Sequence, residues 1–329
     1  MDIDLALLRE VESSKEIGFN ELVQIVEAAI LAAYHRNNGS RDDGARAEVN
    51  RSTGNVHIYQ PNVDEEGNPT GGENDVTPAD FGRIAAHSAK QVIAKRLREI
   101  SDEGLLGEFK GKEGDIVTGL IQQGYRPDVV YLNLGEIEAE MPAAEQVPGE
   151  DYSHGKRIRV YIAKVERTMR GPKIIVSRTH PGLVLKLFAL EVPEIESGLV
   201  EIVRIAREAG HRTKIAVRAN DPGVNAKGAC IGELGQRVRA VQAELNEEKI
   251  DIVDYSDNLT EFVAHALSPA KVSSCFMIDA NSPEKKVRAL VPDFQLSLAI
   301  GKEGQNVRLA HKLTGAKIDV QPDSVMEDD

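Results

Sequence analysis

The hydrophobic positions near the start of the chain recur at helical spacing and then change to a strand pattern. Residues 45–60 carry two short apolar runs around a turn-forming segment, which predicts a β-hairpin. Before residues 45–60, Asn20 is suited to cap the N-terminus of a helix. The apolar positions of that helix are Leu22, Val23, Val26, Ala29, Ile30 and Ala33.

A polar stretch over residues 62–75 follows and predicts a loop. Thr77 and Pro78 then open a helix that we expect to reach about Ile100, because proline is favoured in a first helical turn. Helices combined with a hairpin indicate an α+β domain over residues 1–105.

Residues 106–180 change to short strands separated by Gly, Pro and Asp turns. Five short strands in about 75 residues suggest a small β-barrel. The predicted strands are Asp115–Ile121, Asp128–Leu134, Ile137–Glu140, Arg157–Val165 and Lys173–Ser177.

The last part of the chain repeats itself. Residues 231–239 (IGELGQRVR) correspond to residues 300–308 (IGKEGQNVR), an offset of 69. Each copy has the element order αββααβ, with a Gly-x-x-Gly loop between its last two helices. We expect two domains, 181–256 and 257–329.

This order around a Gly-x-x-Gly loop resembles the prokaryotic type of KH domain, here in tandem. Two glycines leave space for an RNA phosphate to approach the main chain, and the helix that follows directs its free N–H groups at the anion. A single such loop is a weak signal, whereas two copies with the same flanks are specific. The resemblance implies that both loops bind single-stranded RNA.

The candidate RNA-binding residues lie in and beside the two loops. The first loop holds Glu233 and Leu234 in place of a basic residue, so its phosphate contact would depend on Lys227 and Arg237. The full set is Lys227, Gly232, Glu233, Leu234, Gly235, Gln236, Arg237, Arg239, Gly301, Lys302, Glu303, Gly304, Gln305, Asn306 and Arg308.

The five-strand segment resembles an S1 motif, which is an OB-fold barrel. Such barrels bind RNA by stacking bases on aromatic side chains beside basic ones. Tyr125, Arg126, Arg159 and Tyr161 are the candidates here, although strand tyrosines usually pack inside a fold.

An S1 motif followed by two KH domains is the order found in the NusA family. Residues 292–306 (PDFQLSLAIGKEGQN) are a close match to that family, and residues 177–181 (SRTHP) resemble its junction between barrel and first KH domain. The resemblance implies a multidomain α+β transcription elongation factor. Its expected partners are RNA polymerase core, nascent single-stranded RNA and other Nus factors, and a monomer is expected.

The charge distribution agrees with two kinds of partner. The net charge is −13, and residues 1–105 account for most of it with 19 acidic and 11 basic residues. The remaining domains are nearly balanced, so each can present a basic face to RNA. In the NusA family the acidic N-terminal domain contacts RNA polymerase.

No catalytic signature is present, and the eight histidines are scattered at unrelated spacings. An exoribonuclease carrying KH and S1 modules would need a catalytic body for which the chain has no room. The two cysteines form neither a disulfide framework nor a metal motif. We expect a cytoplasmic protein that is not an enzyme, with no cofactor, no metal and no membrane contact. An RNA-binding subunit of a ribosomal or RNA-degradation complex is the alternative.

Overall fold

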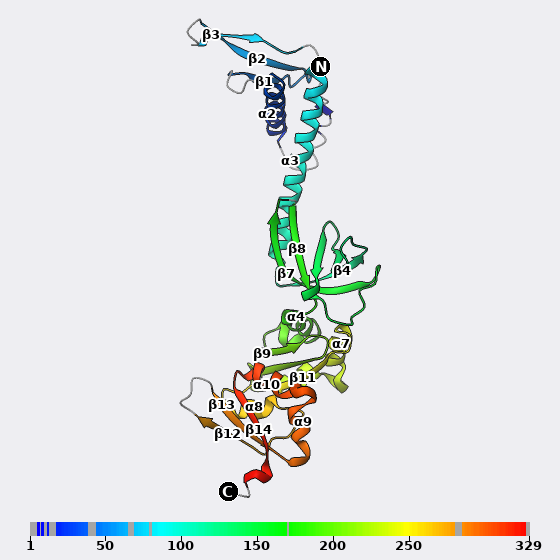
Figure 1. Ribbon diagram of the computed structural model, residues 1–329, viewed down its shortest axis with the longest axis vertical. Helices are drawn as coiled ribbons and strands as arrows, with labels where there is room; N and C mark the ends of the chain where they lie inside the picture. The colour runs from blue at the N-terminus through cyan, green and yellow to red at the C-terminus, as the bar shows by residue number, and fades with distance from the viewer. Residues whose placement is uncertain are drawn as a thin grey trace. The chain divides into compact units, whose positions relative to one another are not determined.

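A computed structural model gives the architecture of the chain (Figure 1). It describes residues 5–6, 8–9, 12, 18–38, 44–64, 69–78, 81–169, 171–279 and 285–326. The chain divides into two compact units, Met1–Leu105 and Leu106–Asp329. Each unit is described by itself below.

The N-terminal unit packs one helix on a small antiparallel sheet. Its core joins apolar side chains of the helix to those of the first two strands, including Val26, Ile30, Val49 and Ile58. The predicted helix and hairpin are confirmed. The elements are α2 (Phe19–Asn38), β1 (Arg46–Val49), β2 (Val56–Val63), β3 (Pro69–Asp75) and α3 (Phe81–Gly111), with strand order β1-β2-β3.

Two predictions for this region are wrong. The segment 62–75 is not all loop, because β3 pairs with β2. β3 is held by its backbone pairing with β2 and by polar side-chain contacts, such as the ion pair between Glu73 and Arg46 of β1 at 2.7 Å. Helix α3 continues 11 residues beyond Ile100, because its last turn is anchored by Phe109, which is 5% exposed.

The barrel has the predicted five strands. Its closed order is β4-β5-β6-β8-β7, and β6 and β8 run parallel while the other pairs are antiparallel. Alternate residues point inward, as in Ile158, Val160 and Ile162. The strands are β4 (Ile116–Gln122), β5 (Val129–Asn133), β6 (Glu138–Pro142), β7 (Arg157–Thr168) and β8 (Gly171–Ser177), with a short helix η1 (Ala143–Glu145) after β6.

The first repeat has the predicted αββααβ order with two short extra helices, α5 and η2. Strand β10 lies between β9, which is antiparallel to it, and β11, which is parallel. The elements are α4 (Pro181–Glu191), α5 (Pro193–Glu196), β9 (Val200–Glu208), β10 (Arg212–Ala219), α6 (Ala226–Ile231), η2 (Glu233–Gly235), α7 (Gln236–Glu244) and β11 (Lys249–Asp254).

The second repeat has the same topology, with β13 between antiparallel β12 and parallel β14. Its elements are α8 (Leu259–Ala266), β12 (Ser274–Asp279), β13 (Lys286–Val291), η3 (Asp293–Gln295), α9 (Leu296–Ile300), η4 (Lys302–Gly304), α10 (Gln305–Thr314), β14 (Lys317–Pro322) and η5 (Asp323–Met326).

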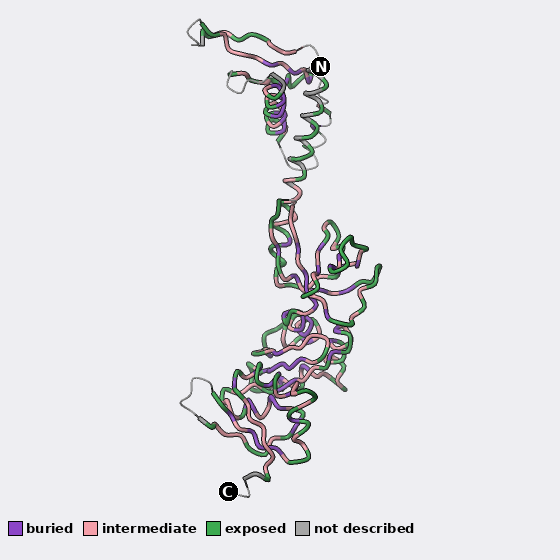
Figure 2. Tube along the Cα trace, in the orientation of Figure 1, coloured by how far each residue is buried: buried purple, intermediate pink, exposed green. Residues whose placement is uncertain are grey.

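The two repeats share a hydrophobic core, visible as the buried segments where they meet (Figure 2). Ala206, Ala216 and Val253 of the first repeat pack with Leu309 and Leu313 of α10. The second repeat therefore covers an apolar face of the first repeat's sheet. Within the described part of the chain, no helix is both long and apolar enough to cross a membrane.

Candidate nucleic-acid interface

The two glycine loops have nearly the same backbone. Gly232 lies at φ 74° and ψ 174°, and Gly301 at φ 76° and ψ 169°. Gly235 lies at φ 75° and ψ 18°, and Gly304 at φ 73° and ψ 14°. The repeat detected in the sequence is therefore also a repeat of conformation.

The first glycine of each loop is required by the helix that follows. A Cβ atom at Gly232 would lie 2.6 Å from Cγ of Arg237, and one at Gly301 would lie 2.8 Å from the backbone nitrogen of Asn306. Only glycine permits this close approach together with a φ near +75°. These two glycines therefore shape the loop, independently of any ligand.

The second half of each loop is left-handed and open. Leu234 and Glu303, at φ 49° and 54°, precede Gly235 and Gly304, which are left-handed as well. A Cβ at Gly304 would meet nothing within 4 Å. Leu234 is 90% exposed. An incoming ligand would meet the main chain at this point with little obstruction.

Both loops lead into a helix whose N-terminus is not capped by a side chain. Gly235 is the N-cap of α7 and Gly304 that of α10, and neither helix has an acidic residue in its first turn. The first N–H groups of a helix have no partner inside it, and the dipole makes that end positive. This arrangement suits a phosphate group.

An arginine on the helix after each loop donates hydrogen bonds to carbonyl oxygens of that loop. Arg239 donates to the carbonyl oxygens of Leu234 and Gly235, the latter at 3.2 Å. Arg308 occupies the corresponding place and donates to the carbonyl oxygen of Glu303 at 3.1 Å. Both arginines are exposed, but Arg308 is also paired with Glu208, so Arg239 is the one that could contact a ligand while supporting its loop.

Arg237 and Asn306 have a structural role that the sequence did not reveal. Arg237 donates to the carbonyl oxygen of Ala229 at 2.8 Å and pairs with Glu194 at 2.8 Å. Asn306 is 3% exposed and donates to the carbonyl oxygens of Leu267, Ala299 and Leu298. Asn306 is therefore closed to a ligand, and the charge of Arg237 is largely neutralised.

The remaining candidates of the second loop divide into two groups. Lys302 is exposed and lines a groove of about 520 Å³. Gln305 and Arg308 turn toward Glu208 of the first repeat, and Arg308 lowers the pKa of that carboxyl to about 2. The groove is lined by Gly210, His211, Arg212, Glu247, Lys249, Pro269, Ser297, Leu298, Gly301, Lys302, Gln305 and Asn306.

In the first loop, Glu233 is exposed, as is Gln236 at the start of α7. Lys227 lies elsewhere, in a separate hollow of about 410 Å³ between α6, β11 and the second repeat. This hollow also holds His265 and Lys271. The first loop therefore has less basic charge beside it than the sequence suggested.

The barrel candidates are split between the surface and a domain junction. Tyr125 is 78% exposed, and its neighbour Arg126 pairs with Asp128 at 2.7 Å. Tyr161 instead stacks on His180 at 4.2 Å, and Arg159 pairs with Glu244 of α7 at 3.2 Å. The last two side chains are held at the contact between barrel and first repeat, whereas Tyr125 is largely exposed and its ring contacts that of Tyr131 at 5.0 Å.

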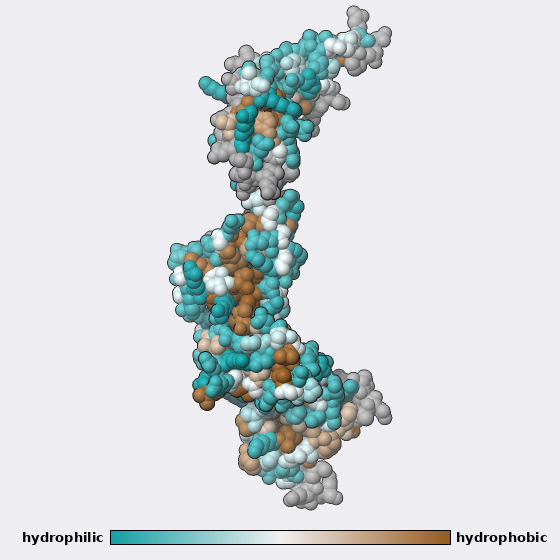
Figure 3. Space-filling view, turned by 180° about the vertical axis from the view of Figure 1, so that it is seen from behind, coloured by the Kyte–Doolittle hydropathy of each residue, from teal (hydrophilic) through white to brown (hydrophobic). Residues whose placement is uncertain are grey.

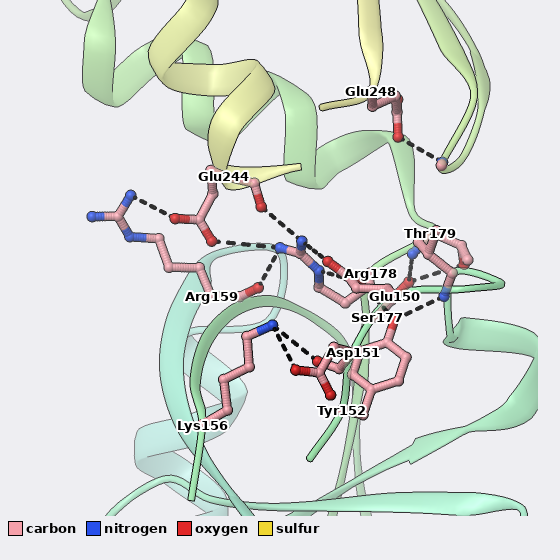
Figure 4. A network of polar contacts seen from close by, with 12 residues as sticks. Glu150, Asp151, Tyr152, Lys156, Arg159, Ser177, Arg178, Thr179, Glu244 and Glu248 are labelled. Atoms are coloured by element: carbon pink, nitrogen blue, oxygen red, sulfur yellow. Dashed lines mark hydrogen bonds and ion pairs between the residues drawn. The ribbon is translucent and has the colours of Figure 1, made fainter. Parts of the chain in front are cut away.

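A buried arginine fixes that contact (Figure 4). The Arg178 side chain is 2% exposed, donates to the carboxylate of Glu150 at 3.0 Å, and donates to the backbone oxygens of Arg159 at 2.9 Å and Glu244 at 2.7 Å. Its place could have been inferred from alternation, because Ile174 and Val176 precede it at the inward positions of β8.

The face of the molecule shown in Figure 3 is largely hydrophilic, with apolar patches among the hydrophilic side chains. Leu298, which lines the groove beside Lys302, is 47% exposed, and Phe294 in η3 is 82% exposed. No group of three or more possible metal-binding side chains occurs among the residues that the structure describes.

Comparison with known domains and proteins decides the family. The NusA N-terminal domain model matches residues 5–70, and the NusA-like first and second KH domain models match residues 178–255 and 259–328. The transcription termination/antitermination protein NusA of Mycobacterium tuberculosis (strain H37Rv) is 53% identical over 331 residues, covering 98% of this chain and 94% of the relative.

The chain belongs to the NusA family. Other NusA relatives are those of Bacillus subtilis, 46% identical over 97% of this chain and 91% of the relative, and Thermus thermophilus, 45% identical over 74% of this chain and 62% of the relative. The two αββααβ repeats are thus NusA-type KH domains, and the five-strand barrel before them fits the expected OB fold.

Proposed function

We propose that this chain is a transcription termination and antitermination factor that binds RNA polymerase and nascent single-stranded RNA, without catalysing a reaction. The relatives named above carry the first part of this description as their name. We further propose that it acts as a cytoplasmic monomer, and that other Nus factors join it on polymerase.

The observation that supports RNA binding best is the pair of glycine loops with matching backbones, each followed by a helix without a side-chain cap. A phosphate placed there would receive main-chain N–H groups that are already oriented. Lys302 adds a positive charge at the second loop. The first loop has no basic residue between its glycines, so we propose that it binds more weakly.

The proposed mechanism is tethering. The acidic unit, residues 1–105, would bind polymerase through complementary charge, while the barrel and KH domains hold RNA as it emerges. A tether raises the local RNA concentration, so weak individual contacts add up. Holding the RNA in this way would bias pausing and hairpin formation.

The test of RNA binding uses the full chain carrying Gly235→Asp and Gly304→Asp, with Gly235→Asn and Gly304→Asn as the matched control. Aspartate and asparagine have similar shapes and tolerate positive φ, so only the added charge differs. We expect the aspartate variant to bind a labelled RNA at least about tenfold more weakly than the asparagine variant, with a smaller salt dependence.

Equal affinity in the two folded variants would overturn the loop mechanism. Binding of the full chain to polymerase core separates the proposal from an RNA-binding subunit of a ribosomal or degradation complex. Retention of core polymerase is the expected result, and its loss with RNA binding intact would favour the alternative.

A further inference from the structure

The last residue of β9, Glu208, joins the two KH domains beside the second glycine loop. Its carboxylate accepts hydrogen bonds from Arg308 at 2.6 and 3.1 Å and from Gln305 at 3.0 Å, and Lys312 lies 3.9 Å away. The Glu208 side chain is 19% exposed. It is therefore a partly buried contact between the domains, with several donors on one acceptor.

The partners of Glu208 lie on α10, the helix that begins directly after the second loop. Gln305 is the first residue of α10, the helix whose N-terminus faces the proposed phosphate site. Arg308 donates to Glu208 and, through another nitrogen, to the carbonyl oxygen of Glu303 within the loop. A side chain of the first KH domain is thus connected to the RNA-binding loop of the second by two consecutive hydrogen-bonded contacts.

The first loop has no equivalent. Arg239, which corresponds to Arg308, donates to the carbonyl oxygens of its own loop, and in the part of the chain that the structure describes it has no carboxylate partner. Among the described residues, the start of the helix after the second loop is tied to the neighbouring KH domain, whereas α7 contacts the barrel at its far end, through Glu244. The shared apolar core sets the general placement of α10 on β9, and Glu208 acts at the end of α10 nearest the loop.

We propose that Glu208 is a positioning residue, which holds the second glycine loop in the orientation that lets one RNA strand occupy both loops. This inference rests on the proposed RNA-binding function and adds a residue that need not touch RNA. Without Glu208 the second loop would still bind RNA, but its orientation to the first loop would be less defined, and the benefit of simultaneous binding would fall.

The test compares Glu208→Ala with Glu201→Ala in the full chain. Glu201 lies on the same strand and pairs with Arg218 at 3.0 Å within the first KH domain. Both variants gain the same net charge, so the general attraction for RNA rises equally. Each is measured against random-sequence RNA pools of about four and about twelve nucleotides, since one KH loop clamps about four.

We expect Glu208→Ala to bind the longer pool about tenfold more weakly than Glu201→Ala, and the shorter pool equally well or more tightly. Equal affinities for the longer pool, with binding by the unmodified protein intact, would overturn the positioning role alone. Parallel loss on both pools would also overturn it, because that pattern means a direct contact or a folding defect. Absence of binding by the unmodified protein would instead defeat the proposed function, and this inference with it.

Discussion

The two glycine loops share a backbone and differ in what surrounds it. The first carries Glu233 and Leu234, and the second carries Lys302 and Glu303, yet the torsion angles of the loops agree within a few degrees. The common feature is the pair of glycines and the start of the following helix. Loop shape is thus set by the main chain, and the side chains remain free to change the strength of binding.

The second residue after each loop differs between the two repeats. Arg237 and Asn306 correspond in the repeat, and both donate to a carbonyl oxygen of the preceding helix. Arg237 and Asn306 therefore have the same structural role. Arg237 also forms an ion pair near the surface, whereas Asn306 is buried. The predictions below test this difference, from the largest expected effect to the smallest.

Replacing the first glycine of a loop by alanine should destabilise the protein more when the change is in the second loop than when it is in the first loop. Gly301→Ala would place Cβ against the backbone of Asn306, which cannot move aside, and we expect a loss of about 4 kcal/mol in free energy of unfolding. Gly232→Ala meets mainly the Arg237 side chain, so we expect about 2 kcal/mol. Urea denaturation measures both values, and equal losses would contradict the asymmetry.

Removing the side-chain donor that follows each loop should also destabilise the protein more in the second KH domain than in the first. Asn306→Ala leaves buried carbonyl groups without a partner, and we expect a loss of about 2 to 3 kcal/mol. Arg237→Ala leaves a carbonyl that water can reach, and we expect about 1 kcal/mol. The same denaturation experiment measures both, and a larger loss for Arg237→Ala than for Asn306→Ala would contradict the predicted order.

Exchanging the loop charges should change RNA affinity without changing stability. Glu233→Lys gives the first loop the basic residue of the second, and we expect it to bind RNA several-fold more tightly, with a steeper salt dependence by about 0.7 per added phosphate contact. Lys302→Glu should have the opposite effect. A salt series with labelled RNA tests both, and no response in either variant would mean that these side chains do not face RNA.

The smallest expected effect is on the stability of the protein at acidic pH. The pKa of Glu208 lies near 2, below its usual value of 4.5, because Arg308 and Gln305 stabilise the carboxylate. A lowered folded-state pKa stabilises the folded state above the unfolded-state pKa, and this contribution disappears as the pH falls from about 4.5 toward 2. We expect Glu208→Ala to be less stable than the unmodified protein by under about 1 kcal/mol at pH 6.

That difference should shrink between pH 4.5 and 3, as measured by urea denaturation at each pH. Glu201→Ala is the matched control, since Glu201 also pairs with an arginine, Arg218 at 3.0 Å, but at an exposed position within the first KH domain. A difference that stays constant down to pH 3 would contradict the ion pair as its source.

The pattern of residues predicted most of the fold. Apolar spacing located the strands of the barrel and the order of both repeats, because burial of one face of each element leaves a periodic trace in the sequence. It missed β3, whose residues are largely polar, and it ended α3 too early, because Gly104 and Gly107 disfavour a helix around the apolar positions Leu105, Leu106 and Phe109. Family membership followed from the glycine loops and their flanks.

The candidate site combines features that the sequence determines with features that depend on folding. The sequence by itself determined the loop backbone, since two glycines at fixed spacing before a helix permit positive φ and a close main-chain approach. Only the tertiary structure decided which basic residues remain available. Arg159, Arg178, Arg237 and Arg308 are equally charged in the sequence, and each is engaged by a carboxylate from another element, at positions that the chain brings together only on folding.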